Sequence, residues 1–206
     1  MILSFIIVWI PQFVYWKMVS GSFLYYSYSN NEHFFFNNPQ IINGLFSYRK
    51  GWLLYTPIMT FALLGIIVLY KRNKNFFLPI LTFQLLNMYI ILSWWAWWYG
   101  GCYGLRAFID SYGILAIPFA AFIDLLIRQK KLFKIPGLVF VFALVLFSVF
   151  QTSQYYYGEI HWDSMSKKAY WSTFGKLSRP DNFKQLLEHP DYAKAKEGIQ
   201  AVKKDE

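Results

Sequence analysis

The amino-acid sequence predicts an all-α integral membrane protein with about five transmembrane helices, aromatic loops on the outer face and a small, polar, helical C-terminal tail. Of its 206 residues, 56% are hydrophobic and only 15% are charged, which is more apolar surface than a soluble domain of this length can bury. The hydrophobic residues form long runs separated by short turns rich in Lys and Arg, a pattern typical of polytopic membrane proteins. Aromatic residues, 22% of the chain, gather near the ends of these runs, where Trp and Tyr rings mark the boundary between lipid and water.

Five apolar runs are the expected spans, and they lie at about 1–16, 52–70, 76–95, 107–127 and 135–155. Residues 1–157 would then form the transmembrane domain and residues 158–206 the tail. The first run is shorter than the ~20 residues that cross a bilayer, and it lacks the basic start and the cleavage site of a signal peptide. We therefore expect a truncated spanning helix, and a chain that begins partway through a longer protein.

Polar residues and prolines inside these runs have expected structural roles. Pro57 lies near the start of the second run, where a kink or a helix entry is tolerated, and Pro118 lies inside the fourth, where it can kink the helix. Gln84 and Asn87 lie inside the third run, and we expect them to hydrogen-bond to neighbouring helices. Asp124 precedes Arg128 by four residues, a spacing that predicts an ion pair on a helix.

The distribution of Lys and Arg predicts the orientation of the chain. The turns 71–75 and 128–134 together hold seven of these residues, whereas the longer loops 17–51 and 96–106 hold four. Because basic loops remain in the cytoplasm, both turns and the N-terminus are predicted to be cytoplasmic, and both loops and the tail to be outside. The basic residues counted are Lys71, Arg72, Lys74, Arg128, Lys130, Lys131 and Lys134 in the turns, and Lys17, Arg49, Lys50 and Arg106 in the loops.

The net charge of +9 does not predict nucleic-acid binding, because the basic residues occur in short runs between apolar segments. The single cysteine, Cys102, has no disulfide partner and no metal-ligand spacing around it, so its expected role is packing.

The stretch from Ser93 to Pro118 is the most unusual part of the sequence. Four tryptophans and a tyrosine are followed by three glycines within five positions, and glycine lets another group approach the backbone closely. We interpret part of this stretch as a contact surface for a sugar or a lipid. The alternative is that the aromatic rings anchor a helix end at the membrane interface, which is their commoner role. The contact residues would be Trp97, Trp98, Tyr99, Gly100 and Gly101.

Arg106 and Asp110 are four residues apart where the fourth run begins. One interpretation is an ion pair within the helix near the interface. The other is that Arg106 binds a lipid phosphate, which its planar guanidinium suits, while Asp110 orients it. Arg49 and Lys50 lie on the same predicted side and would add positive charge for that phosphate, unless they only reach from the second span to the interface.

A divalent metal is the one cofactor that the sequence raises, and no ligand set is assigned. Glu32 with His33, and Glu159 with His161 and Asp163, contain suitable ligand types, but such residues on a surface are more often simply solvated. No paired carboxylates stand out as a general base, so the catalytic residues stay unknown.

The tail divides into two parts. Residues 158–176 are aromatic and mixed polar, and we expect them to pack back onto the outer loops. Residues 182–206 are predicted to form two short polar helices on either side of His189 and Pro190, because proline ends helices.

Three phrases of the sequence resemble a known family: GLFSYRKGWLLYTP, WWYGGCYGLRAFIDSYGILAIP and QYYYGEIHWDSMSKKAYW. They are similar to the C-terminal half of bacterial polytopic glycosyltransferases of the GT-C class, of the protein O-mannosyltransferase and aminoarabinose-transferase type, and especially to Bacteroidetes members. The resemblance covers about residues 17–171.

The resemblance implies a bacterial inner-membrane enzyme that transfers a sugar from a polyprenyl-phosphate donor on the periplasmic face. In that class the catalytic acidic motif lies in the first outer loop, ahead of the region matched here. The resemblance therefore implies an incomplete copy, completed by an N-terminal half or a partner subunit. The alternative is a non-catalytic membrane protein, either a gene remnant or a structural subunit. A transporter is disfavoured because the spans hold few charges.

Overall fold

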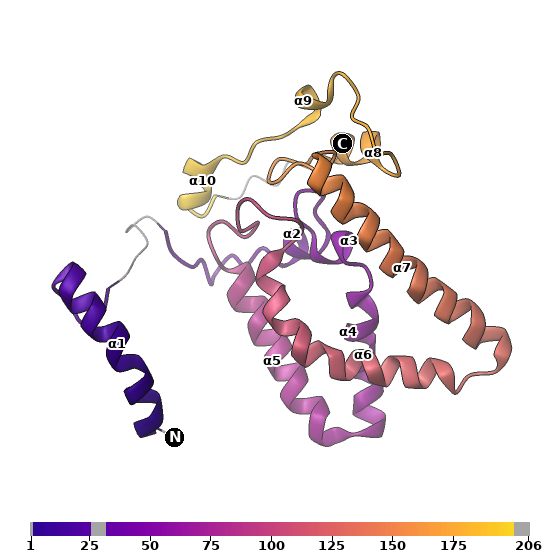
Figure 1. Ribbon diagram of the computed structural model, residues 1–206, viewed down its shortest axis with the longest axis horizontal. Helices are drawn as coiled ribbons and strands as arrows, with labels where there is room; N and C mark the ends of the chain where they lie inside the picture. The colour runs from indigo at the N-terminus through magenta and orange to yellow at the C-terminus, as the bar shows by residue number, and fades with distance from the viewer. Residues whose placement is uncertain (1, 26–31, 200–206) are drawn as a thin grey trace. The chain divides into compact units, whose positions relative to one another are not determined.

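The computed structural model describes residues 2–25 and 32–199, and the chain divides into two units, Met1–His33 and Phe34–Glu206 (Figure 1). Every regular element in the described residues is a helix, and one isolated antiparallel bridge joins Phe34 to Trp94. The predicted all-α class is therefore confirmed. The end of the predicted polar tail, residues 200–206, lies outside the described residues.

The first unit contains helix α1, Ile2–Ser20, which extends four residues beyond the expected first run and includes Pro11. Gly21 follows with a φ of +78° and donates its N–H to the Lys17 carbonyl oxygen at 3.1 Å. A left-handed glycine in this position is a common helix stop, because glycine adopts positive φ without a steric penalty.

The second unit contains the long helices. Among the described residues, three segments are long and apolar enough to cross a membrane: α5 (Lys74–Leu92), the continuous segment of η1 and α6 (Arg106–Ile127), and α7 (Lys131–Tyr157). They correspond to the expected spans 76–95, 107–127 and 135–155, and the other two spans are not confirmed. The long helices are α4 (Met59–Arg72), α5 (Lys74–Leu92), the 3₁₀ helix η1 (Arg106–Ser111) with α6 (Tyr112–Ile127), and α7 (Lys131–Tyr157).

The expected span 52–70 is interrupted. A short helix, α3 (Trp52–Tyr55), ends before Pro57, and α4 begins at Met59. Proline lacks an N–H and disfavours helical backbone in the residue before it, so the helix does not run through this point. The 14 residues of α4 extend over about 21 Å, less than the roughly 30 Å of a bilayer core.

Helices α4 and α6 pack with their backbones in contact. A Cβ built on Gly65 of α4 would lie 1.9 Å from the carbonyl oxygen of Pro118 on α6, so only glycine fits at this crossing. Near the far end of the same pair, Asp124 of α6 accepts from Arg128, as the sequence predicted, and also from Arg72 of α4. The predicted interhelical bond from Gln84 is wrong for the described residues, where its buried amide has no partner.

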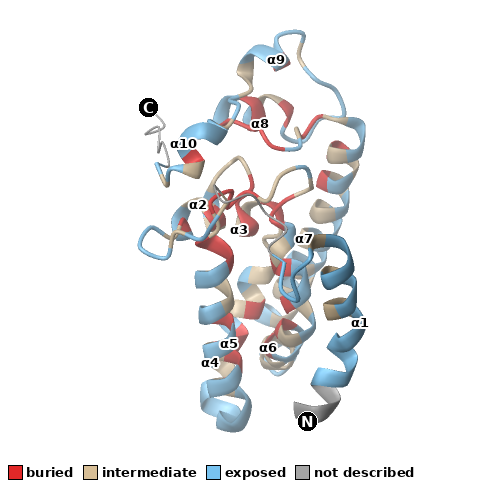
Figure 2. Cartoon of the chain, turned by 90° about the vertical axis from the view of Figure 1, so that its left-hand side faces the viewer, coloured by how far each residue is buried: buried red, intermediate tan, exposed pale blue. Residues whose placement is uncertain are grey.

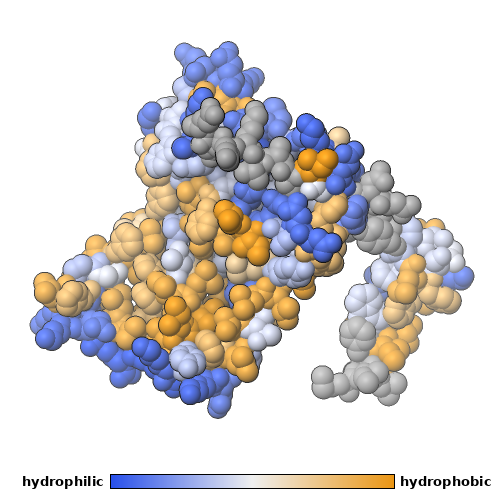
Figure 3. All heavy atoms as spheres, turned by 180° about the vertical axis from the view of Figure 1, so that it is seen from behind, coloured by the Kyte–Doolittle hydropathy of each residue, from blue (hydrophilic) through white to orange (hydrophobic). Residues whose placement is uncertain are grey.

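The second unit has two distinct ends. The turns α4–α5 and α6–α7, which contain the basic residues, lie away from the short helices α2 (Ile41–Phe46) and α3, the loop 93–105 and the tail (Figure 1). We call these the basic end and the loop end. An apolar band separates the hydrophilic ends in the space-filling view (Figure 3). With three helices that could cross a membrane, an apolar band between two hydrophilic ends is consistent with a membrane protein.

Burial is concentrated at the loop end (Figure 2). No residue in the most apolar stretch of α7 is buried, and the buried residues of this helix are Gln151 and Gln154 near its loop end. Gln154 donates to the carbonyl oxygens of Thr173 and Lys176 in the tail, at 2.8 and 2.7 Å. The tail contains the short helices α8 (Lys167–Thr173), α9 (Phe183–Leu186) and α10 (Tyr192–Lys196).

Candidate functional site

A cleft of about 710 Å³ opens at the loop end. One wall is the second half of α2 and the turn after it, residues 42–49, and the floor includes Trp97 and Trp98. The tail supplies the rest, with residues 165–167 at the start of α8 and residues between 187 and 199 around α10. The predicted packing of residues 158–176 onto the loops is confirmed, because Tyr170 packs against Tyr55 and Tyr48. The cleft thus depends on three segments far apart in the sequence.

Arg49 is the principal cation on the cleft wall. Its backbone N–H donates to the Ser47 hydroxyl at 3.1 Å, which fixes the turn, and its Nη1 donates to the Asp163 carbonyl oxygen at 2.8 Å. The guanidinium lies 5.8 Å from the ring of Trp98, a cation–π distance. Burial lowers the pKa of Arg49, opposed by the nearby Asp163 and Glu188 carboxylates, yet a guanidinium stays charged in proteins.

Most of the donor capacity of Arg49 is unused. A guanidinium has five N–H donors, and one of them makes a hydrogen bond within the described residues. Because the side chain is largely enclosed and lines a cleft, the remaining donors favour an anionic ligand with several acceptor oxygens.

Trp97 and Trp98 are held in an aromatic cluster under the tail. They are 5% and 3% exposed, and the ring of Trp98 lies 5.6 Å from that of Tyr192 on α10. Ala195 of α10 packs into the same cluster. These tryptophans therefore lie inside the folded loop end, where they line the cleft, and do not project outward as interfacial anchors.

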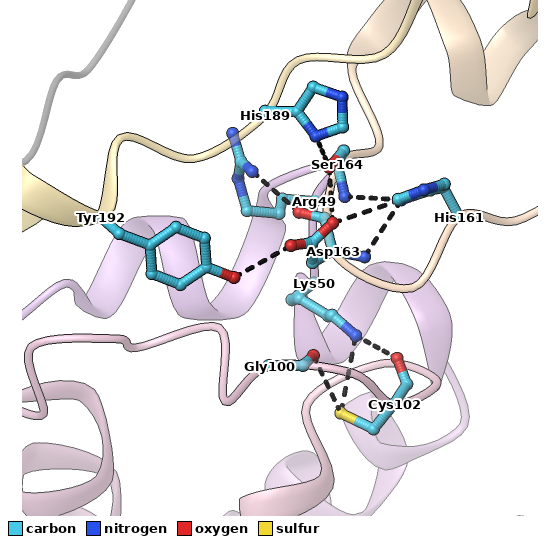
Figure 4. A network of polar contacts seen from close by, with 9 residues as sticks. All are labelled: Arg49, Lys50, Gly100, Cys102, His161, Asp163, Ser164, His189 and Tyr192. Carbon is cyan, nitrogen blue, oxygen red and sulfur yellow. Dashed lines mark hydrogen bonds and ion pairs between the residues drawn. The ribbon is translucent and has the colours of Figure 1, made fainter. Parts of the chain in front are cut away.

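A buried carboxylate organises the polar side of the cleft (Figure 4). Asp163 is 2% exposed; its Oδ2 accepts from the Tyr192 hydroxyl at 3.0 Å and its Oδ1 accepts from the Ser164 hydroxyl at 2.5 Å. The Ser164 Oγ also lies 2.8 Å from Nδ1 of His189, which lines the cleft. A continuous hydrogen-bonded chain thus joins Asp163, Ser164 and His189.

The proton positions in this chain follow from the donor inventory. An ionised carboxylate accepts hydrogen bonds and donates none, and a serine hydroxyl has a single proton. The Ser164 proton therefore points to Asp163, and Nδ1 of His189 must hold a proton and donate it to Ser164. In the neutral imidazole this leaves the lone pair on Nε2.

His161 lies on the other side of Asp163. Its Nδ1 accepts from the backbone N–H groups of Ser164 at 3.2 Å and Asp163 at 3.4 Å. Burial lowers the pKa of His161, partly opposed by the Asp163 carboxylate. Nδ1 of His161 also lies 3.3 Å from Oδ1 of Asp163.

Lys50 lies beneath the cleft and does not line it. It is 1% exposed, and its ammonium donates to the carbonyl oxygen of Cys102 and lies 3.5 Å from the Cys102 sulfur. Burial lowers the pKa of Lys50. The expected phosphate contact is replaced by a structural one, since Lys50 ties the loop 93–105 to the turn after α2.

Arg106 and Asp110 are exposed on η1, away from the residues of the cleft. They form no ion pair with each other in the described part of the chain. The reason is the helix type, because at three residues per turn positions i and i+4 point roughly 120° apart. The expected pairing assumed an α-helix.

Tyr99, Gly100 and Gly101 also lie outside the cleft. Tyr99 and Gly100 have φ values of +53° and +64°, so they form a sharp turn, and the Tyr99 hydroxyl donates to the Ile91 carbonyl oxygen at 2.9 Å. A Cβ on Gly101 would lie 3.3 Å from the ring of Trp162. These glycines let the loop fold closely onto the tail.

The described residues contain no group of three or more His, Cys, Asp and Glu side chains that could hold a metal ion. Glu32 and His33 belong to the first unit, and the Asp163 carboxylate is engaged by hydroxyl groups. The metal interpretation of His161 and Asp163 therefore gains no support from the geometry.

Comparisons with known proteins gave no matching family model, no matching curated protein and no matching solved structure. The resemblance to GT-C glycosyltransferases therefore stays a prediction, and the cleft is interpreted from its own chemistry.

Proposed function

We propose that this chain is a membrane glycosyltransferase of the GT-C type, or the C-terminal part of one, and that its cleft binds the phosphate-linked sugar of a polyprenyl-phosphate donor. The observation that supports this most directly is Arg49, a mostly enclosed guanidinium with unused donors on the wall of a cleft at the loop end. If the three apolar helices cross a bilayer, that end lies at the depth of lipid head groups, where the donor phosphate resides.

The cleft residues suit the parts of such a head group. The fork of Arg49 matches two oxygens of a phosphate, and Trp98 behind it keeps the guanidinium in place. Trp97, which lines the cleft at 5% exposure, is the proposed sugar contact. Lys167 and Lys194 lie at the exposed rim, although Lys194 is also 3.2 Å from Asp191, so Arg49 is the main phosphate ligand in this proposal.

The side of the membrane follows from the same proposal. The basic turns lie at the opposite end from the cleft, and the positive-inside rule would place them in the cytoplasm. The cleft would then face the periplasm of a bacterial inner membrane, the side on which the resemblance expects transfer. The proposal assigns donor binding to this chain and leaves the base for the acceptor to another segment or subunit.

The test is binding of a short-chain polyprenyl-phosphate sugar to the purified full chain in detergent. We expect Arg49→Ala to weaken binding by about 10- to 100-fold, the loss of a charge-assisted hydrogen-bonded contact of roughly 1.5–3 kcal/mol. Arg106→Ala is the matched control, because Arg106 is an exposed arginine outside the cleft. Binding lost in Arg106→Ala and kept in Arg49→Ala would move the phosphate site to η1 and refute the cleft.

A non-catalytic membrane subunit is the second candidate, and one observation favours it. The apolar stretch of α7 has none of its residues buried, so this helix has a full surface for other helices as well as for lipid. Absence of donor binding by the wild-type chain, together with stable co-purification of another membrane protein, would support this candidate over the enzyme.

A further inference from the structure

We propose that a groove between α4 and α6 binds an anionic phospholipid, with the lipid phosphate at Lys71 and an acyl chain along the groove. The groove has a volume of about 360 Å³, within the roughly 300–1,000 Å³ of small-molecule sites. It lies toward the basic end, whereas the cleft lies at the loop end, so this inference is independent of the function of the cleft. The lining residues are Leu64, Ile67, Val68, Lys71 and Arg72 of α4, and Phe122 and Leu125 of α6.

The lining changes from apolar to cationic along α4. Residues 64, 67, 68, 71 and 72 recur at the spacing of one helix face, and the first three are apolar while the last two are basic. Leu64 and Arg72 are eight residues apart, which is about 12 Å along the helix axis. A phospholipid has the same order, an apolar chain that leads to a charged phosphate. The groove therefore matches an anionic lipid in both polarity and charge.

The walls of the groove are held in place by contacts within the protein. The backbone contact between α4 and α6 fixes the two helices at one point, and Arg72 donates to Asp124 across them at the basic end. The ring of Phe122 stacks on that of Phe61, with centroids 4.8 Å apart and an interplanar angle of 16°. A site with fixed walls pays less ordering entropy when a ligand binds.

Lys71 is the cation that remains available to a ligand. Asp124 accepts from Arg72 and also from Nε of Arg128, at 3.0 and 2.8 Å, so two arginines share one carboxylate. Lys71 is exposed, and it forms no ion pair within the described residues. The rim thus has more positive than negative charge, which complements the phosphate of an anionic lipid.

The position of the groove favours a lipid over a water-soluble ligand. Leu64 and Ile67 are 42% and 60% exposed, and they would face hydrocarbon if the apolar helices cross a bilayer. The long stem of Lys71 can then reach the head-group layer with its ammonium. Under the proposed orientation this end is cytoplasmic, and the anionic lipids of that leaflet attract basic residues near its surface.

The first experiment tests the phosphate contact. Native mass spectrometry of the full chain released from detergent measures binding of phosphatidylglycerol, with phosphatidylcholine as the zwitterionic comparison. We expect Lys71→Gln to weaken binding of phosphatidylglycerol about fivefold, equivalent to about 1 kcal/mol, and to leave binding of phosphatidylcholine unchanged. Lys130→Gln is the matched control, because Lys130 is an exposed lysine of the same end that does not line the groove.

The second experiment tests the acyl-chain contact with the same measurement. Leu64→Trp fills the groove and should weaken binding of both lipids about tenfold. Leu85→Trp on α5 is the matched control, since Leu85 is 57% exposed and lies outside the groove. The melting temperature in detergent without added lipid checks that each variant keeps the fold.

Four outcomes would overturn the proposal. Equal losses in Lys71→Gln and Lys130→Gln would assign binding to the general positive charge of the basic end. Equal lipid binding by Leu64→Trp and Leu85→Trp would exclude a chain in the groove. Loss of a dimer or of a co-purified membrane protein in Leu64→Trp, with lipid binding unchanged, would show that a protein helix occupies the groove. Competition by glycerol phosphate at equal concentration would assign the site to a free anion.

Discussion

The hydroxyl of Tyr192 donates a hydrogen bond to the buried carboxylate of Asp163 at 3.0 Å, and the Tyr192 ring packs edge-on against Trp98. This pair fastens α10 to the segment before α8 and to the loop 93–105 at the same time. Tyr192 therefore adds to the packing of Ala195 in the same aromatic cluster and to the contact of Lys196 with the Trp95 ring, which also position α10.

Tyr192→Phe should loosen α10 while keeping the aromatic packing. The substitution removes one of the two hydroxyl donors to a buried carboxylate, and a hydrogen bond to a charged group contributes about 1.5–3 kcal/mol. We expect faster proteolysis of the tail, measured by fragment analysis. Tyr156→Phe on α7 is the control, because Tyr156 is 81% exposed and its ring packs against that of Tyr157; equal sensitivity of both variants would contradict this role.

Gly65→Ala should destabilise the α4–α6 pair. The added methyl group would meet the backbone of Pro118, which cannot rotate away, and overpacking of this kind costs at least about 1–3 kcal/mol. The readout is the melting temperature in detergent. Gly113→Ala on α6 is the matched control, since nothing lies within 4 Å of its added Cβ, and alanine favours a helix. A higher melting temperature for Gly65→Ala would show that the two helices do not meet at this point.

The stability of the tail should fall when pH decreases from 7 to 5. Burial lowers the pKa of His161 in the folded chain below its unfolded value near 6.5. Below that unfolded value the unfolded chain binds more protons than the folded one, so acid favours unfolding until the folded pKa is also passed. Protease resistance of the tail without ligand measures this. His161→Gln should remove part of the pH dependence, and an unchanged profile would exclude His161 as its source.

Lys50→Met should free the loop 93–105. The ammonium of Lys50 donates to the Cys102 carbonyl oxygen, and methionine can fill the space without this bond. Because Cys102 is the single cysteine, its alkylation rate reports loop opening directly, and we expect an increase of about tenfold, equivalent to about 1.4 kcal/mol of local opening. Arg106→Met, on the exposed face of η1, should leave the rate unchanged.

The orientation can be tested with the same thiol. A membrane-impermeant reagent should label Cys102 from outside intact cells under the proposed orientation. A chain with Cys102→Ser and Lys130→Cys should be labelled only after the membrane is opened, because Lys130 lies in the basic turn between α6 and α7. The reverse pattern would place the cleft in the cytoplasm and exclude a donor site on the outer face.

Much of the fold was predictable because hydropathy and proline act locally. Long apolar runs gave the helices α5, η1–α6 and α7, and charge spacing gave the Asp124–Arg128 pair. Pro57 was expected to mark a kink or a helix entry, and α4 does begin just after it, but the separate short helix α3 before it was not predicted. Local rules state that a proline disturbs a helix, and tertiary packing decides by how much.

The cleft was predictable only in part. Arg49, Trp97 and Trp98 were predicted as contact residues for a donor and line the cleft, and a short basic turn and an aromatic stretch are visible in the sequence. The tail half was missed: Ser164 contacts His189 across 25 residues, and neither residue belongs to a periodic pattern. The spacing of Arg106 and Asp110 predicts an ion pair on an α-helix, where residues i and i+4 lie on the same face. On a 3₁₀ helix these two positions do not lie on the same face.

The short length of α4 has a consequence for the surrounding lipid. Helix α4 has 14 residues, whereas α5 and α7 have 19 and 27. In a bilayer, the lipids beside α4 would therefore face a hydrophobic mismatch. Bilayers respond to a short span by thinning, which would lower the lipid surface next to the break at Pro57. A lipid-linked phosphate beside α4 would then reach the loop end while it remains in the head-group layer.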